Sequence, residues 1–304
     1  MGKAAFCVFS CLLACWWLPA GGQYYFYNSR YYDALFTVDA GVSAGGMNCL
    51  TDLGGKKETG RRFISDMDPG ATRLCGGIST AVHYNNAIGI RLELATGAVS
   101  GSDSILKKYA SATNGRYLRN LSFRSRITEI SLAVELYPLS LLPDAGIALQ
   151  PYALAGIGRF SFNPQAVWNN SWISLQPLHT EGQGFPEYPG QPVYKLTQFN
   201  LPFGGGIRYE LSPILNIRGE IICRHLFTDY LDDVSTAYIH PSLFDRHLSP
   251  QAAALARTLA DRSRGTGITD GGHEGEIRGS KKNNDVFFSV SLKCSFVMGR
   301  KRIK

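Results

Sequence analysis

After its first two dozen residues, the chain has no apolar run long enough to cross a membrane as a helix. It also has few cysteines, and no spacing between them resembles a metal site. Lys and Arg outnumber Asp and Glu by 31 to 24, but basic and aromatic residues do not interleave as they do on nucleic-acid-binding surfaces. We therefore expect no membrane helix, metal, cofactor or nucleic-acid partner, and no pattern identifies a small-molecule substrate.

The first 22 residues have the organisation of a secretory signal peptide. Lys3 is a short positive region, Ala4 to Leu18 form an apolar core, and small residues precede a cleavage site before Gln23. The alternative is a lipoprotein signal that ends at Cys15. We disfavour it because the two tryptophans directly after this cysteine extend the apolar run. We expect residues 1–22 to be removed on export.

The stretch from Asn86 to Gly97 shows the pattern on which the fold prediction depends. Its apolar residues occupy every second position, and charged or small residues lie between them. A period of two is typical of a β-strand with one apolar face. The stretch around Glu129 and Glu135 repeats the pattern, with Ile130, Leu132, Val134 and Leu136 on the apolar side.

Eight such stretches occur, the first at about Ala34 to Met47 and the last around Phe288 to Phe296. In the fifth, we assign Tyr152, Leu154, Phe160 and Phe162 to the apolar side and Arg159 to the polar side. Long loops alternate with short turns at Asn85-Asn86, Leu139 to Gly146 and Ser212-Pro213, as in outer-membrane barrels. A short helix is expected in the fourth long loop, where Ser249-Pro250 caps residues 251–262.

The predicted fold is all-β: an eight-stranded antiparallel transmembrane β-barrel with long external loops and short periplasmic turns. We expect a signal peptide at 1–22, a tyrosine-rich lead-in at 23–33, the barrel at 34–297 and a basic periplasmic tail at 298–304. The expected location is the outer membrane of a Gram-negative bacterium of the Bacteroidetes type, with its lipid as a partner.

The polar sides of the strands carry six basic and six acidic residues. An eight-stranded barrel is just wide enough for side chains to fill its interior, and unpaired buried charges are costly. We expect these residues to pair and to leave no pore, and we favour this structural role over a catalytic pair of carboxylates. The predicted lumen network is Asp39, Arg91, Glu93, Glu129, Glu135, Arg159, Arg208, Glu210, Arg218, Glu220, Arg224 and Lys293.

Two cysteines, Cys49 and Cys75, flank the first long loop. Both would be exposed to an oxidising periplasm during export, so they are a candidate disulfide.

Some small barrels are enzymes that use residues at the rim. The candidates here are His179, His225, Asp229, Asp232 and Asp233, because a histidine beside a carboxylate can act as a general base. However, no His-Ser-acid or His-Asp arrangement recurs at a fixed strand height, and Asp232-Asp233 would equally bind a cation or cap a turn. We expect no catalytic residues and no enzymatic activity.

Three stretches near the loops carry a resemblance to a known family: 119–125 (RNLSFRS), 175–184 (LQPLHTEGQG) and 228–236 (TDYLDDVST). With Arg278-Gly279 shortly before Asp285, they resemble the PorG-type outer-membrane barrels of the Bacteroidetes type IX secretion system, over about residues 34–296. His179 departs from the motif, which usually has glycine there. The matching residues are Arg119, Asn120, Arg124, Thr180, Glu181, Gly182, Gln183, Gly184, Asp229, Tyr230, Asp232 and Asp233.

The resemblance implies a non-enzymatic barrel that anchors or contacts a periplasmic ring lipoprotein of the PorK/PorN type. That machinery exports proteins and, in gliding species, supports motility. The motif-bearing loops are expected outside the cell, whereas the ring is periplasmic. The motifs then either have structural roles or touch other secretion components, and ring contact falls to the short turns and the tail. The alternative is a free-standing structural or surface-binding barrel whose loops bind external ligands.

Overall fold

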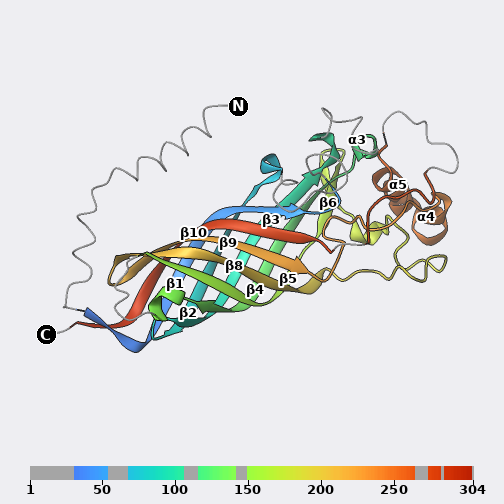
Figure 1. The fold of residues 1–304 in the computed structure, drawn as a ribbon. Coiled ribbons are helices and arrows are strands. Elements are labelled where there is room, and N and C mark those ends of the chain that lie inside the picture. The colour runs from blue at the N-terminus through green and yellow to red at the C-terminus, as the bar shows by residue number, and fades with distance from the viewer. Residues whose placement is uncertain are drawn as a thin grey trace, which may run out of the picture.

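The computed structural model describes residues 31–53, 68–105, 116–141, 149–263, 273–281 and 284–302. The predicted signal peptide and most of the predicted lead-in lie outside these ranges. Eight strands form a closed antiparallel barrel (Figure 1), which confirms the predicted fold class. They are β1 (Tyr31–Leu50), β2 (Arg73–Tyr84), β3 (Ile88–Ser102), β4 (Ser122–Leu136), β5 (Leu149–Ser161), β8 (Thr197–Ser212), β9 (Leu215–Leu226) and β10 (Val286–Arg302).

The barrel is closed by the first and last strands. Each strand pairs with its neighbour along the chain, with β5 next to β8, and β1 pairs with β10 in a register that places Gly41 opposite Ser295. Closure leaves no unpaired barrel edge at which another chain could add a strand. The tight turn between β2 and β3 forms as predicted, with Asn85 and Asn86 at φ 49° and 53°.

Apolar side chains cover the outside of the barrel and charged side chains lie inside. Ile90 on β3 exposes 56% of its surface, whereas the adjacent Arg91 exposes 2%. Leu132 and Ile221 repeat the contrast on β4 and β9, at 49% and 55%. A protein in water would have the reverse distribution, so this is the surface of a transmembrane barrel.

The faces assigned to β5 were wrong. Tyr152, Leu154 and Phe160 point inward and are buried, whereas Arg159 is exposed on the outer face and does not belong to the lumen network. The alternation of this strand is weak because small residues separate its large ones, so either assignment fits a period of two. Packing decides between them: a side chain at Gly158 would meet Asn200 within the lumen.

The predicted lead-in and tail are partly strand. Tyr31 to Asp33 pair with Arg300 to Arg302 at the ends of β1 and β10, so the sheet continues past both predicted boundaries. The side chain of Arg300 lies 2.7 Å from Glu210 and donates to the Pro213 carbonyl at 3.1 Å. Glu210, which was predicted in the lumen, therefore pairs at the mouth on the turn side.

The long loops fold into a dome over the opposite mouth, where α4 and α5 gather in Figure 1. The predicted helix is α5, and the Ser249 hydroxyl caps it by accepting from the Ala252 N–H. Within the ranges that the structure describes, no helix is long and apolar enough to cross a membrane. The dome contains η3 (Pro69–Ala71), α3 (Arg116–Arg119), β6 (Pro164–Trp168), β7 (Ser171–Ser174), η6 (Gln176–Leu178), α4 (Ser242–His247) and α5 (Pro250–Ala260).

Candidate functional site: the lumen and the loop dome

Ion pairs cross the middle of the lumen. The Nη1 atom of Arg91 lies 2.7 Å from Glu220 Oε1 and 3.1 Å from Glu135 Oε1. Arg218 bridges Glu135, at 3.3 Å, and Asp39. Four strands, β1, β3, β4 and β9, thereby meet in one network.

Two further pairs extend this network along the barrel. Lys293 Nζ lies 2.9 Å from Glu93, and Arg224 Nε lies 3.0 Å from Glu129. Asn200 donates to the other oxygen of Glu129 at 2.7 Å. These pairs lie buried along the lumen.

The lumen charges balance after Arg159 and Glu210 are removed from the predicted set. Five acidic and five basic side chains remain, all buried: Asp39, Glu93, Glu129, Glu135 and Glu220 against Arg91, Arg208, Arg218, Arg224 and Lys293. Arg208 differs from the others because its guanidinium stacks over the Tyr137 ring at 4.1 Å and donates to Gln150.

Two tyrosines that the alternation of the strands did not predict complete this network. Tyr137 donates to Glu135 at 2.7 Å and Tyr152 donates to Glu220 at 2.5 Å. A correct orientation of β5 would have placed Tyr152 among the lumen residues. Tyr137 lies just beyond the end of β4, where alternation gives no signal.

In the dome, Glu181 of the TEGQG stretch is fully buried and accepts from four groups, one of which is the Thr236 hydroxyl at 2.7 Å. The backbone N–H groups of Ser235 and Thr236 each donate to its carboxylate at 3.0 Å, and Arg278 Nη1 lies at 2.9 Å. The resembling motifs at 180–184 and 228–236 and the Arg278-Gly279 pair thus converge on one carboxylate.

Asp233 is the second buried carboxylate of this network. It accepts from the hydroxyls of Thr180 and Tyr194, both at 2.6 Å, while Arg278 donates to its backbone carbonyl at 2.6 Å. Arg278 also donates to the carbonyl of Ala260 at the end of α5. One buried arginine therefore joins three segments of the dome.

The backbone of the TEGQG stretch needs the left-handed region. Gly182 and Gly184 have φ values of 75° and 81°, which residues with a side chain rarely adopt. His179, at the position where the resembling motif usually has glycine, also has a positive φ of 50°.

The residues of the RNLSFRS stretch separate in the structure. Arg119 forms a two-point contact with Asp103, at 2.8 and 3.0 Å, and donates to the Asp52 carbonyl. Asn120 donates to the carbonyl of Arg262. Arg124, by contrast, lies on the outward face of β4 with its guanidinium 5.4 Å from the Trp172 ring centre.

Acidic residues gather where the first and fourth loops meet. Asp232 accepts from the Leu53 N–H at 3.0 Å, and Asp285 accepts from the Leu231 N–H at 2.9 Å. Burial, with repulsion between neighbouring carboxylates, holds the pKa of Asp232 and of Asp285 well above the ordinary value. In the described ranges, no group of three or more His, Cys, Asp or Glu residues is arranged to hold a metal ion.

Burial also raises the pKa of Asp229 to about 7 and that of Asp233 to about 6. Nearby Asp52 and Glu181 add to the shift at Asp229. The folded dome therefore favours the protonated form of Asp229 at mildly acidic pH.

The catalytic candidates do not form an evident active site. His225 is exposed on the outer face of β9, His179 packs on Phe185 with ring centres 5.6 Å apart, and Asp232 and Asp233 hold the dome together. A pair that the sequence analysis missed is His273 Nδ1 and Asp261, 2.6 Å apart.

Ser263 lies beside this pair but does not complete a catalytic triad. Its hydroxyl lies 3.5 Å from Nδ1 of His273, the same nitrogen that Asp261 contacts. A triad needs the serine and the acid on opposite nitrogens of the imidazole.

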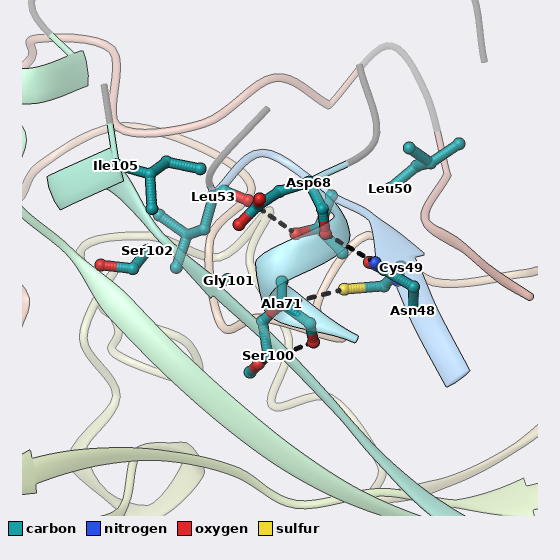
Figure 2. Close-up of a pocket in the computed structure, with 11 residues that line it drawn as sticks. Asn48, Cys49, Leu50, Leu53, Asp68, Ala71, Ser100, Gly101, Ser102 and Ile105 are labelled. Carbon is teal, nitrogen blue, oxygen red and sulfur yellow. Dashed lines mark hydrogen bonds between the residues drawn. The ribbon is translucent and has the colours of Figure 1, made fainter. Parts of the chain in front are cut away.

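The candidate disulfide is not formed, because Cys49 and Cys75 are both free thiols. Cys75 pairs with Gly45, and Cys49 lies four residues further along β1, roughly 13 Å away and too far to bridge. Figure 2 shows the Cys49 sulfur directed at the Ser100 carbonyl, 3.9 Å away, where η3 fills the gap between β1 and β3.

No model of a known protein family matches the chain. No curated protein matches it. Similar solved structures include neisserial surface protein A (9% identity, TM-score 0.37, 87% of this chain and 98% of that one). Outer membrane protein OprG from Pseudomonas aeruginosa is 10% identical, with a TM-score of 0.39 over 88% of this chain and 97% of that one. Outer membrane protein AlkL is 12% identical, with a TM-score of 0.35 over 90% of this chain and 95% of that one. Likenesses this distant carry no argument about function, and the fold rests on the strand register itself.

Replacing Arg218 with methionine removes the arginine partner of Asp39 and leaves Arg91 as the arginine that pairs with Glu135. We expect the free energy of unfolding to fall by about 3–5 kcal/mol, the usual effect of breaking a buried pair. Urea unfolding in lipid vesicles measures this change. The control is Arg159→Met on the outer face, for which we expect a change below about 1 kcal/mol. Equal losses for the two variants would contradict the orientation of β5.

Replacing Glu181 with glutamine removes the charge that pairs with Arg278. The dome should open locally by about 3 kcal/mol while the barrel stays folded, and limited proteolysis followed by mass spectrometry measures where cleavage occurs. Glu187→Gln, which alters a carboxylate paired on the surface with His247, is the control and should leave the cleavage pattern unchanged. Unaltered protection in the Glu181 variant would show that this network does not hold the dome.

The raised pKa of Asp229 predicts that the dome is more stable in acid. Its contribution is present below the ordinary value of 3.8 and is lost as the pH rises through about 7. Backbone amide hydrogen exchange of the dome should be followed from pH 4 to pH 8. After correction for the intrinsic exchange rate at each pH, the protection of the dome amides should fall as the pH rises. Asp229→Asn should reduce this dependence without abolishing it, because Asp232, Asp233 and Asp285 also have raised pKa values. An unchanged slope in the variant would assign the whole dependence to these other carboxyls.

Proposed function

We propose that this chain is a non-enzymatic β-barrel of the outer membrane of a Gram-negative bacterium. The observation that carries the proposal is the combination of an apolar outer wall with a lumen filled by paired charges. Such a barrel is stable in lipid and offers no conduit for solutes. Its exported leader, expected from the sequence, is consistent with this location.

More specifically, we propose that it is a subunit of a type IX secretion system of the Bacteroidetes type that anchors or contacts the periplasmic ring lipoprotein. The resemblance of the loop motifs supports this role. Glu181, Asp233 and Arg278 are used inside the dome, so the motifs serve the stability of the barrel. Ring contact then falls to the opposite mouth, at Asn85-Asn86, Ser212-Pro213 and the end of β10.

The second candidate is a surface-binding barrel. It is favoured by a cleft of about 400 Å³ in the dome, lined by apolar side chains that include Tyr238, Ile239 and Phe244. This cleft lies on the side of the long loops, where an external ligand would arrive.

Crosslinking in intact cells, followed by detergent extraction and pull-down of the tagged barrel, tests the ring contact. We expect the periplasmic ring lipoprotein to co-purify, and Lys301→Glu with Lys304→Glu to reduce its recovery at least tenfold. The control is Arg246→Glu with Lys281→Glu, which reverses two charges on the dome side and should change nothing.

A barrel that is recovered alone after crosslinking would overturn the secretion assignment. If Phe244→Asp in the dome cleft then reduces cell adhesion while secretion stays normal, the surface-binding role takes its place.

A further inference from the structure

On the outer wall of the barrel, on the dome side, lies an open groove of about 740 Å³. The groove is bounded by η3 and by the hairpin of β6 and β7. Figure 2 shows the part of its lining in which Ala71 of η3 lies beside Ser100 of β3. We call it the basic groove and define it by Arg73, Ser100, Ser102, Ser122, Arg124 and Trp172.

The two arginines of the basic groove have no ion pair with any carboxylate of the described residues. Arg73 donates to the Ser100 hydroxyl at 3.0 Å, and Arg124 stacks over Trp172. Among the lining residues that the structure describes, Asp68 is the one carboxylate, and it accepts from the Gly70 N–H at 3.0 Å as the cap of η3. The groove therefore has an excess of positive charge, whereas Arg91 and Arg278 are neutralised within the fold.

The basic groove lies just beyond the apolar band of the barrel. Arg124 and Arg126 share the outward face of β4 with Ile130, and Arg124 is six residues, roughly 20 Å, further along the strand. This distance puts the groove at the level of lipid headgroups. Trp172 and Trp168 expose 47% and 36% of their surface there, as is typical of aromatic residues at a membrane interface.

We propose that the basic groove binds the phosphorylated sugar headgroup of a glycolipid in the outer leaflet. Arginine presents paired N–H donors that match phosphate oxygens, which accounts for Arg73 and Arg124. The partly exposed Ser102 hydroxyl is a partner for a sugar hydroxyl, whereas the Ser100 hydroxyl is already bonded to Arg73 and to the Ala71 carbonyl. The Trp172 indole offers an apolar face to a sugar ring. The inference rests on the proposed membrane location, but the binding test below is done in micelles and does not require it.

The tryptophans provide a direct readout. The chain has four, of which Trp16 and Trp17 lie in the expected signal peptide. In a chain that starts at Gln23, Trp168→Phe leaves Trp172 as the single fluorophore, and it lines the groove.

The experiment titrates this single-tryptophan chain, refolded in zwitterionic detergent micelles, with diphosphoryl lipid A. We expect a saturable change in Trp172 emission. Dephosphorylated lipid A should bind at least tenfold more weakly, and inorganic phosphate should give no saturation in the same range. Arg73→Gln with Arg124→Gln should weaken binding of diphosphoryl lipid A at least tenfold.

The matched control is Arg246→Gln with Arg257→Gln on the dome helices, which removes the same charge and should leave the affinity unchanged.

Before the titration, each variant is run on a denaturing gel without boiling, where a folded barrel migrates differently from the unfolded chain. If the groove variant does not fold, the proposal is tested by comparing the binding of phosphorylated and dephosphorylated lipid A to the unaltered groove. Equal binding of these two lipids, equal binding by groove and control variants, or saturation by inorganic phosphate alone would overturn the proposal. The lipid-binding result does not depend on the ring contact, so failure of the pull-down experiment would not change it.

Discussion

The structure depends on pairing the charges that are buried in the lumen. A buried arginine inside so narrow a barrel is stabilised by nearby carboxylates, and most of those that pair here come from another strand. Lys293 and Glu93 are 200 residues apart, and Arg218 and Asp39 are 179 apart. Each pair ties two strands together at one height. A register slip of one residue would turn these charges into the lipid, so pairing fixes the register of the sheet.

The dome repeats this arrangement above the membrane. Arg278 is buried against Glu181 and reaches the carbonyls of Asp233 and Ala260, while apolar side chains fill the space beneath. The cluster beneath the dome includes Met47, Phe123, Phe160, Leu231 and Phe287, contributed by strands and by the fourth loop. The barrel thus contains salt bridges at its middle and a hydrophobic layer at its mouth.

The sequence predicted the fold where alternation is strong, as in β3, β4, β9 and β10, and it placed Ser249 correctly as the cap of α5. It failed at β5, because an eight-stranded lumen also holds Tyr152 and Phe160, and an aromatic residue fits either face. Strands β1 and β10 extend past residues 33 and 298 because the two chain ends pair with each other, which leaves no local signal in the sequence. The contact between Glu181 and Arg278 spans 97 residues. The motifs indicated that these residues matter, but only the folded chain shows that they meet.

The pairing of β1 with β10 has a consequence for biogenesis. Some 250 residues separate Gly41 from its partner Ser295, so the ring of strands cannot close until almost the whole chain has been translated and exported. Until then, the chain carries two open sheet edges and an outer surface of leucine, isoleucine and phenylalanine in an aqueous compartment. Delivery to the membrane must therefore hold the polypeptide unfolded and shielded, and insertion and closure must occur together.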